Sequence, residues 1–264
     1  MTTHPSILVV DDEADTCRNL SDILTDLGYQ VDTAPDGFTA LDLVRKKAYD
    51  VALLDLKMPG MDGLTLYREL RKLRSSTVAI VVSAYANKST AEEALTSGIW
   101  QVLAKPVDLG HLLPLVNEAL GQPLVLVVDD DPDLCANLWD LLRERSYRVA
   151  IAHDEAQAAR HLHEHDFTIV LIDLKLPQGD GSQVFQCVRR SNPQARTIVI
   201  TGHRVEMDPV VQRVVAEGAD AVCYKPFDVP RLLATLEQLT TEHSGPADES
   251  ARPPSEEREH AREL

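Results

Sequence analysis

The chain has 264 residues, a formal net charge of −16 at pH 7 and 44% hydrophobic residues. This length allows about two globular domains, each with its own hydrophobic core. No apolar run approaches the roughly 18 residues of a membrane helix, and the first residues do not resemble a signal peptide. No segment forms the basic stripe that nucleic-acid binding requires. We therefore expect a cytoplasmic protein that contacts neither membranes nor nucleic acids.

The sequence contains a tandem repeat. Residues 6–24 align with residues 124–142 at an offset of 118 positions, with 11 of 19 residues identical. Residues of the same kind recur at equivalent positions of the two copies: Asp55 and Asp173, Ser83 and Thr201, Lys105 and Lys225. A repeat of this length indicates two copies of one domain.

In each copy, short runs of Val, Ile and Leu alternate with amphipathic segments, which is typical of a parallel sheet with helices on both faces. Strands of the first copy are predicted at Ile7–Val10, Gln30–Thr33, Val51–Leu54, Val78–Val82 and Gln101–Ala104. Helices are predicted at Ala14–Leu27, Gly37–Lys47, Leu64–Leu73, Ser89–Ser97 and Leu109–Leu120. We therefore predict an α/β fold with two flavodoxin-like, doubly wound (βα)5 domains of strand order 2-1-3-4-5.

The domain limits follow from the repeat and from composition. The first domain is predicted at residues 1–121, a linker at 122–123 and the second domain at 124–240. So short a linker should bias the domains toward one relative orientation. Residues 241–264 are acidic and rich in Ser and Pro, so we expect a mostly disordered tail.

Acidic residues gather where predicted strands end. Asp11 and Asp12 follow the first strand of the first copy, and Asp55 follows the third. These two strands are neighbours in a sheet of this order, so the three carboxylates should meet in one crevice. Carboxylates held together repel one another, and Mg²⁺ is the hard cation that such oxygen ligands suit.

The same edge of the sheet offers groups for phosphoryl chemistry. Lys105 follows the fifth strand and supplies a positive charge, while the hydroxyl of Ser83 ends the fourth strand and can donate to a phosphoryl oxygen. With its charge offset in this way, a phosphoryl group can be attacked by the Asp55 carboxylate. The second copy repeats the whole set: Asp129, Asp130, Asp173, Thr201 and Lys225.

This motif set, two adjacent aspartates, a third aspartate, a Ser or Thr and a Lys-Pro pair, resembles the receiver domain of two-component response regulators, twice over residues 6–240. The resemblance implies that Asp55 and Asp173 accept phosphoryl groups from the phosphohistidine of a sensor histidine kinase or phosphotransfer protein, and that each domain then dephosphorylates itself. It also implies that both Lys-Pro bonds are cis.

The resemblance further implies a Mg²⁺ site in each copy. Its ligands would be the acceptor aspartates, Asp12 and Asp130 directly, Asp11 and Asp129 mainly through water, and the backbone carbonyls of Lys57 and Lys175.

Both copies depart from the family pattern at one position. Receivers commonly carry Tyr or Phe three residues before the lysine, a ring that moves on phosphorylation, but this chain has Val102 and Val222 there. Either these domains signal without the aromatic residue, as many receivers do, or their output mechanism differs. We also hypothesise that four bulky side chains placed to flank the path of the attacking water slow hydrolysis of the phosphoryl group: Lys57, Lys175, Tyr85 and His203.

Other candidate residues have simpler interpretations. The four cysteines form no CxxC pair, which fits a reducing compartment, and Cys17 and Cys135 are interpreted as packing residues rather than redox sensors. The histidines of the HLHEH segment, His161, His163 and His165, are interpreted as a solvated helix surface rather than a metal site.

The sequence therefore predicts a dual-receiver response regulator in a phosphorelay that is no enzyme beyond its own phosphorylation and dephosphorylation. No output module can be read beyond residue 240, so we expect output through contacts with an unidentified downstream protein. The alternative is a phosphorylation-independent scaffold that uses the same fold for binding. The sequence leaves homodimerisation open.

Overall fold

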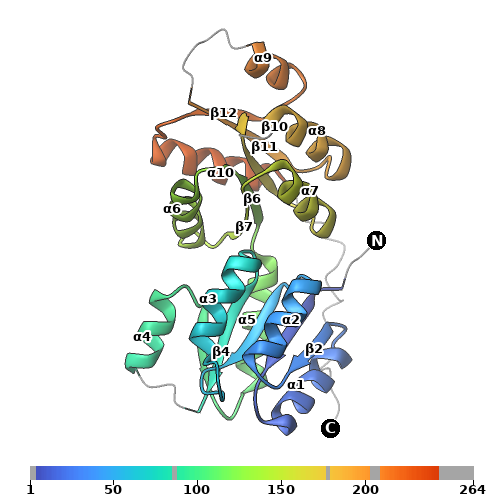
Figure 1. Ribbon diagram of the computed structural model, residues 1–264, viewed down its shortest axis with the longest axis vertical. Helices are drawn as coiled ribbons and strands as arrows, with labels where there is room; N and C mark the ends of the chain where they lie inside the picture. Colours follow the sequence, from blue (N-terminus) through green and yellow to red (C-terminus); the bar gives the residue numbers. More distant parts are fainter. Residues whose placement is uncertain (1–3, 85–87, 177–178, 203–208, 244–264) are drawn as a thin grey trace, which may run out of the picture.

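The computed structural model describes residues 4–84, 88–176, 179–202 and 209–243, which form two α/β units (Figure 1). The predicted tail, Tyr85 and His203 lie outside the described residues, apart from the first residues of the tail, which continue the last helix. Within the described residues, none of the helices combines the length and apolarity needed to cross a membrane.

The first unit is a five-stranded parallel sheet of order β2-β1-β3-β4-β5. Its strands are β1 Ser6–Val10, β2 Gln30–Ala34, β3 Val51–Asp55, β4 Val78–Ser83 and β5 Gln101–Ala104. Its helices are α1 Ala14–Asp26, α2 Gly37–Lys46, α3 Gly63–Leu73, α4 Lys88–Thr96 and α5 Leu109–Gly121. The predicted doubly wound fold is confirmed.

The second unit repeats this arrangement, with sheet order β12-β11-β8-β6-β7. Its five sheet strands are β6 Leu124–Val128, β7 Arg148–Ala152, β8 Ile169–Asp173, β11 Arg196–Thr201 and β12 Ala221–Tyr224. Its helices are α6 Pro132–Arg143, α7 Glu155–Glu164, α8 Gly181–Ser191, α9 Pro209–Ala216 and α10 Val229–His243. Read from β7, this order is also 2-1-3-4-5.

One small element was not predicted. After β8, the strands β9 Lys175–Leu176 and β10 Gly179–Asp180 form a short antiparallel pair. Two-residue strands leave no alternating hydrophobic pattern, so sequence periodicity does not reveal them.

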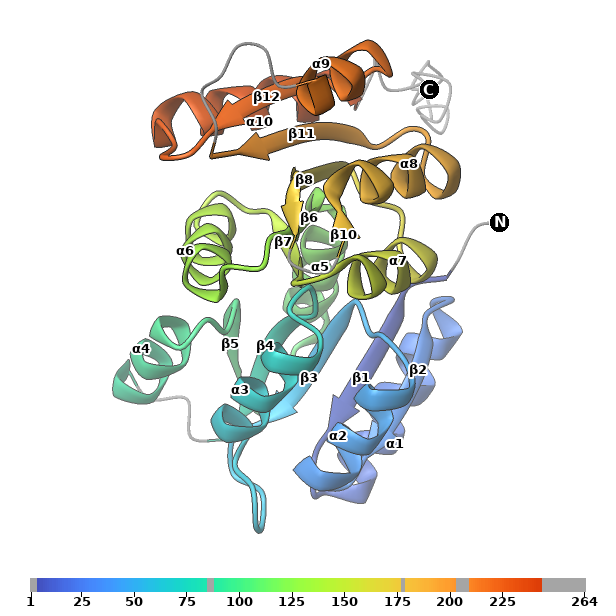
Figure 2. The same cartoon turned by 45° about the horizontal axis from the view of Figure 1, so that its top comes forward.

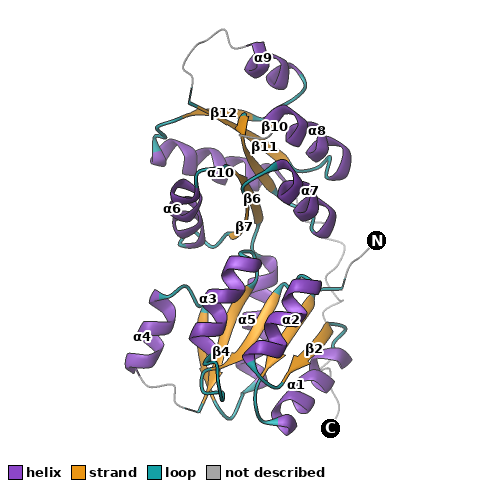
Figure 3. Ribbon diagram, viewed as in Figure 1, coloured by secondary structure: helices purple, strands orange, loops and turns teal. Residues whose placement is uncertain are grey.

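Helices cover both faces of each sheet, as Figure 3 shows for the lower, first unit. One core of this unit packs α2, α3 and α4 against one sheet face, with Leu8, Leu54 and Val81 fully or almost fully buried. The other core packs α1 and α5 against the opposite face. The central strands are therefore buried on both sides, which explains why they read as continuous apolar runs.

The two units touch through specific side chains. The α6 and α7 helices lie on the side of the second unit that faces the first in both views (Figures 1 and 2). The Arg148 guanidinium at the start of β7 is 2.8 Å from a carboxylate oxygen of Asp50, and the Trp139 indole N–H donates to the carbonyl of Ser75 at 3.0 Å. Such contacts, together with the short connection between Gly121 and Leu124, hold the units in one arrangement.

Candidate phosphoryl-transfer sites

Three carboxylates meet at the carboxyl end of each sheet. Asp11 follows β1 and Asp55 ends β3, and these strands are hydrogen-bonded neighbours. The carboxylate oxygens that Asp11, Asp12 and Asp55 offer lie within 4.8 Å of one another. The same holds in the second unit for Asp129, Asp130 and Asp173. The structure thus brings together both acidic sets that the sequence predicted.

In the first site, two of the carboxylates are buried and share one lysine. Asp11 and Asp55 are 3% and 7% exposed, whereas Asp12 is open to solvent. The Lys105 Nζ atom is 2.6 Å from Asp11 Oδ2 and 3.1 Å from Asp55 Oδ2. Because buried charges are costly unless paired, this lysine stabilises both ionised carboxylates.

The second site has the same arrangement, with one of the two lysine contacts shorter. The Lys225 Nζ atom is 2.6 Å from Oδ2 of both Asp129 and Asp173. Asp129 is fully buried, and its Oδ1 atom accepts a hydrogen bond from the backbone N–H of Asp131 at 3.0 Å. In the first site the backbone N–H of Glu13 donates to Asp11 in the same way.

Burial and ion pairing compete in setting the pKa values of these groups. Burial alone would lower the pKa of Lys105 and of Lys225, but their hydrogen bonds to two carboxylates outweigh it, so both pKa values are raised. Burial raises the pKa of Asp129, and its hydrogen bond with Lys225 offsets this only in part. Both lysines are therefore charged at neutral pH.

The hydroxyl residues lie beside the lysines. Ser83 ends β4 and is fully buried, and it is paired in register with Ala104, the residue before Lys105. Its backbone carbonyl accepts a hydrogen bond from the N–H of Lys105 at 3.0 Å. Thr201 occupies the equivalent place at the end of β11, next to Tyr224 and Lys225. Both Lys-Pro peptide bonds are cis.

The backbone after each acceptor aspartate folds back on its side chain. The N–H of Lys175 donates to Asp173 Oδ1 at 2.9 Å, and the N–H of Lys57 makes a longer contact with Asp55 Oδ1 at 3.4 Å. These turns fix the acceptor side chains at the ends of their strands.

Two glycines that the sequence analysis did not single out complete the turns. A Cβ atom on Gly63 or on Gly181 would collide with the backbone carbonyl of Asp55 or Asp173, respectively. The N–H of Gly63 also donates to the carbonyl of Leu56 at 3.0 Å. The Asp-Gly pair repeated after each acceptor was the sequence signal that could have identified them.

The chemistry of the donors suits a hard divalent cation. Each site offers three carboxylates, one of them exposed, and such oxygen ligands with room for water are what Mg²⁺ prefers. The adjacent lysine and hydroxyl leave a place where a phosphoryl group could be bound by positive charge and a hydrogen-bond donor. The arrangement can therefore support attack of a carboxylate on phosphorus.

The two valines that replace the usual aromatic residue are partly buried. Val102 on β5 packs against the α2–α4 core of the first unit, and Val222 on β12 packs in the equivalent core of the second unit. A valine in this place fills part of the core and has no ring that could move between positions.

One sequence interpretation is wrong in part. Only His163 of the HLHEH segment is exposed, while His161 and His165 are half-buried. A ring nitrogen of His161 lies 3.1 Å from the carbonyl of Ile151, and burial lowers the pKa of both His161 and His165. This part of the helix surface is therefore only partly open to solvent. Within the described residues, the histidines take part in no cluster of metal-ligating groups.

The cysteines behave as packing residues. Cys17 and Cys135 are buried, and each thiol lies 3.3 Å from the carbonyl oxygen of the first aspartate in its acidic pair.

Comparison with known proteins gives a consistent result. The model of the response regulator receiver domain matches residues 7–117 and 125–237. A response regulator receiver protein of Anaeromyxobacter sp. (strain Fw109-5) is 34% identical over 235 residues, which cover 89% of this chain and 95% of that protein. The transcriptional regulatory protein ZraR of Klebsiella oxytoca is 40% identical over 115 residues, 44% of this chain and 26% of that protein.

Among solved structures, a CheY-like receiver domain protein from Methanospirillum hungatei JF-1 is 30% identical. The match covers 45% of this chain and 94% of that one, with a TM-score of 0.43.

Proposed function

This chain belongs to the response regulator receiver domain family of two-component systems, and we propose that it accepts phosphoryl groups on both Asp55 and Asp173. The observation that carries the proposal is the duplicated set of two buried carboxylates, one exposed carboxylate and a shared lysine at the end of each sheet. Each copy contains an acceptor carboxylate, two further carboxylates, a hydroxyl group and a lysine for the proposed reaction.

In the proposed reaction, an Oδ atom of Asp55 or Asp173 attacks the phosphorus atom of a phosphohistidine, the P–N bond breaks, and the imidazole leaves. Lys105 or Lys225 offsets the charge on the transferring group. The hydroxyl of Ser83 or Thr201 donates to one of its oxygens. Mg²⁺ bound by the acidic set would supply further charge compensation.

Each unit has its own set of proposed Mg²⁺ ligands. Asp12 and Asp130 would bind directly, and Asp11 and Asp129 mainly through water. The acceptor aspartates and the carbonyls of Lys57 and Lys175 would complete each set. Asp12 and Asp130 are exposed, which gives the ion a path from solvent to each set of ligands.

We propose receiver domains at residues 1–121 and 124–240, with a linker at 122–123 and a tail at 241–264. The end of α5 at Gly121 and the start of β6 at Leu124 support the linker, while α10 continues past residue 240 to His243. The proposed phosphodonor is a sensor histidine kinase or a phosphotransfer protein, and output would pass through contacts with a downstream protein.

Phosphorylation with Mg²⁺ and acetyl phosphate, read by intact mass, tests the proposal. Wild type should gain up to two phosphoryl groups, Asp55→Asn and Asp173→Asn up to one each, and the double variant none. The same variants incubated with a panel of phosphorylated histidine kinases identify the donor for each domain. Absence of labelling with every donor would refute the proposal.

A scaffold that binds partners independently of phosphorylation is the second candidate, favoured by one observation. Val102 and Val222 provide no ring to transmit the state of either acceptor. If pull-down partners bind wild type and the Asp55→Asn, Asp173→Asn double variant with equal affinity, this candidate replaces the first.

A further inference from the structure

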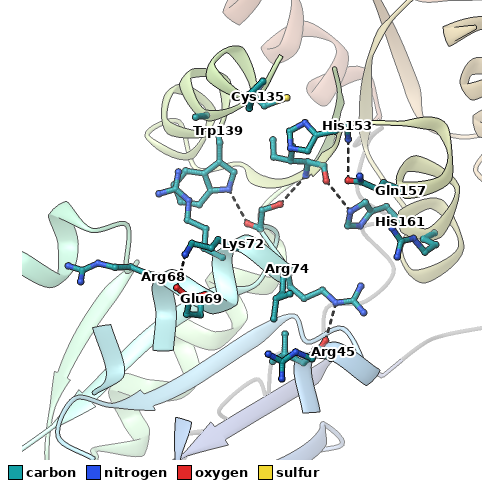
Figure 4. Close-up of a pocket in the computed structure, with 18 of the residues that line it drawn as sticks. Arg45, Arg68, Glu69, Lys72, Arg74, Cys135, Trp139, His153, Gln157 and His161 are labelled. Carbon is teal, nitrogen blue, oxygen red and sulfur yellow. Dashed lines mark hydrogen bonds and ion pairs between the residues drawn. The ribbon is translucent and has the colours of Figure 1, made fainter. Parts of the chain in front are cut away.

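A cleft of about 940 Å³ lies between the two units, outside both phosphoryl-transfer sites. Its lower wall is formed by the ends of α2 and α3 and the segment after α3, and its upper wall by α6, α7 and the segment before α7 (Figure 4). Ligand pockets in proteins typically have volumes of about 300–1,000 Å³. The cleft is therefore large enough for a small molecule, and both units would contact it.

The lining of the cleft carries more cations than carboxylates although the chain is acidic. Its lining contains seven arginines and lysines but only two glutamates, in a protein of net charge −16. The cations come from segments that are far apart in the sequence. A local excess of positive charge in a negatively charged protein attracts anions to the cleft.

Four of the seven cations have carboxylate partners. Arg45 and Lys72 each pair with an acidic residue of their own helix, and two arginines are committed to the contact between the units. The Arg71 guanidinium lies 3.5 Å from the centre of the Trp139 ring and also pairs with Asp140. Arg74 pairs with Glu164 across the interface at 2.5 Å and donates to the carbonyl of Val44. These arginines hold the walls of the cleft together and do not depend on a ligand.

Three other cations are available to a ligand. Lys46 and Arg68 on the lower wall and Arg160 on the upper wall are exposed, and no carboxylate of the described residues lies within ion-pair distance of them. His161, also in the lining, is mostly neutral at neutral pH because burial lowers its pKa. The positive charge thus comes from arginine and lysine and persists at neutral and higher pH.

We propose that this cleft binds a small molecule that carries two or more phosphate groups. Guanidinium groups match phosphate oxygens with paired hydrogen bonds, and lysine adds a point charge. Cations on both walls favour a ligand with anionic groups at more than one end. Such a ligand bridges the units and stabilises their relative arrangement, because it binds only when both walls are in place.

Isothermal titration of the full chain with inorganic pyrophosphate and with ATP, in EDTA so that the acidic sites hold no divalent ion, tests the proposal. We expect 1:1 binding of at least one probe, with an increase in Tm. Tighter binding of ATP would indicate that the ligand is a nucleotide, and equal binding that the phosphate groups suffice. Failure of both probes to bind would overturn the proposal.

Two triple variants that each lose three positive charges distinguish binding in the cleft from general electrostatic attraction to the protein. The triple variant Lys46→Gln, Arg68→Gln, Arg160→Gln should bind the probe at least about tenfold more weakly. The control variant Arg18→Gln, Arg190→Gln, Arg231→Gln loses three exposed cations outside the cleft and should bind as wild type does. Equal weakening in both triples would overturn the proposal.

The phosphoryl-transfer sites need a separate control. The Lys105→Gln, Lys225→Gln double variant removes the cations that could hold a phosphate at those sites, and it should bind pyrophosphate or ATP with unchanged affinity. Loss of binding in this variant would place the ligand at the acidic sites and overturn the proposal, whether or not the aspartates accept phosphoryl groups.

Discussion

At the scale of single residues, two glycines keep the acceptor aspartates in place. Gly63 begins α3 against the carbonyl of Asp55, and Gly181 begins α8 against that of Asp173. A methyl group at either position must push a helix away from the strand that carries the acceptor. We expect Gly63→Ala and Gly181→Ala to lower the free energy of unfolding by about 1–3 kcal/mol, measured by urea denaturation.

Gly121→Ala is the matched control for these variants. It also lies in a helix, but nothing stands within 4 Å of where its Cβ atom would be. Alanine there should leave stability unchanged or raise it slightly, because alanine favours helix. If Gly63→Ala unfolded at the same urea concentration as Gly121→Ala, the steric explanation would be wrong.

The four thiols should differ in reactivity. Burial raises the pKa of Cys135 to about 12 and also raises that of Cys17 and, at a half-buried position, of Cys223. The thiolate is the reactive form, so a raised pKa slows reaction at pH 8. We expect Cys187, half-buried, to react first with a disulfide reagent, and Cys17 and Cys135 to react only on unfolding.

Peptide mapping after brief labelling assigns the reactive thiol. A Cys187→Ser variant should remove the fast phase, and urea should expose the remaining thiols together. Fast labelling of Cys135 in the native protein would show that α6 opens more readily than its burial implies.

At the scale of elements, the sequence predicted the helices and strands of the first unit to within about one or two residues. The reason is that strong sequence signals mark where these elements begin and end. Gly28 ends α1 with φ of 92°, and Asp108 caps α5 by accepting from the N–H of Gly110. The site residues could be predicted equally well, because each stands at the end of an apolar strand or directly after it. The contact faces of α6 and α7 could not be predicted from the sequence, since their partners lie in the other unit.

The face of α6 shows this limit most clearly. Trp139 reads as an ordinary core position of an amphipathic helix, yet its ring is 4% exposed partly because Arg71 of the first unit covers it. Its N–H donates to Ser75, also in the first unit. Only the relative placement of the units reveals that this residue joins them.

We expect Trp139→Ala to uncouple the two units. The substitution removes a buried ring, the cation–π contact and a hydrogen bond across the interface, a loss of about 3–5 kcal/mol. Differential scanning calorimetry should then show two separate transitions, where contact between the units in wild type favours one.

Trp100→Ala is the control, because Trp100 packs within the first unit. It should lower the stability of that unit without separating the transitions any further. A Trp139→Ala thermogram with the same shape as that of wild type would contradict the assigned role.

At the scale of the whole molecule, the arrangement of the two units creates a cleft that neither unit contains alone. The basic cleft combines side chains from three segments that lie far apart in the sequence, residues 45–46, 68–74 and 160. The sequence shows these short basic segments but not that they face one another across a cleft. The two-residue linker predicted a preferred orientation but not which faces meet.

The ion pair between Asp50 and Arg148 makes this arrangement sensitive to acid. Burial alone would raise the pKa of Asp50, but the charge of Arg148 and the N–H of Ser6 outweigh burial and hold the pKa below its usual value. A carboxyl with a depressed pKa adds stability above its unfolded pKa of about 4. That contribution is lost as the pH falls through the depressed, folded pKa.

The prediction is tested by the Tm difference between wild type and Asp50→Asn as a function of pH. At pH 7 the variant leaves Arg148, whose side chain is 6% exposed, without its carboxylate, a cost of about 3–5 kcal/mol. From pH 5 to pH 3 the difference should shrink, because Asp50 of the wild type takes up a proton in the unfolded state before it does in the folded state. Because the Asp50 charge also raises the pKa of half-buried His165, both proteins are compared in a His165→Gln background. Asp42→Asn, at an exposed pair with Arg45, should show almost no difference at any pH. A gap for Asp50→Asn that stays constant down to pH 3 would mean that this pair does not hold the units together through its charge.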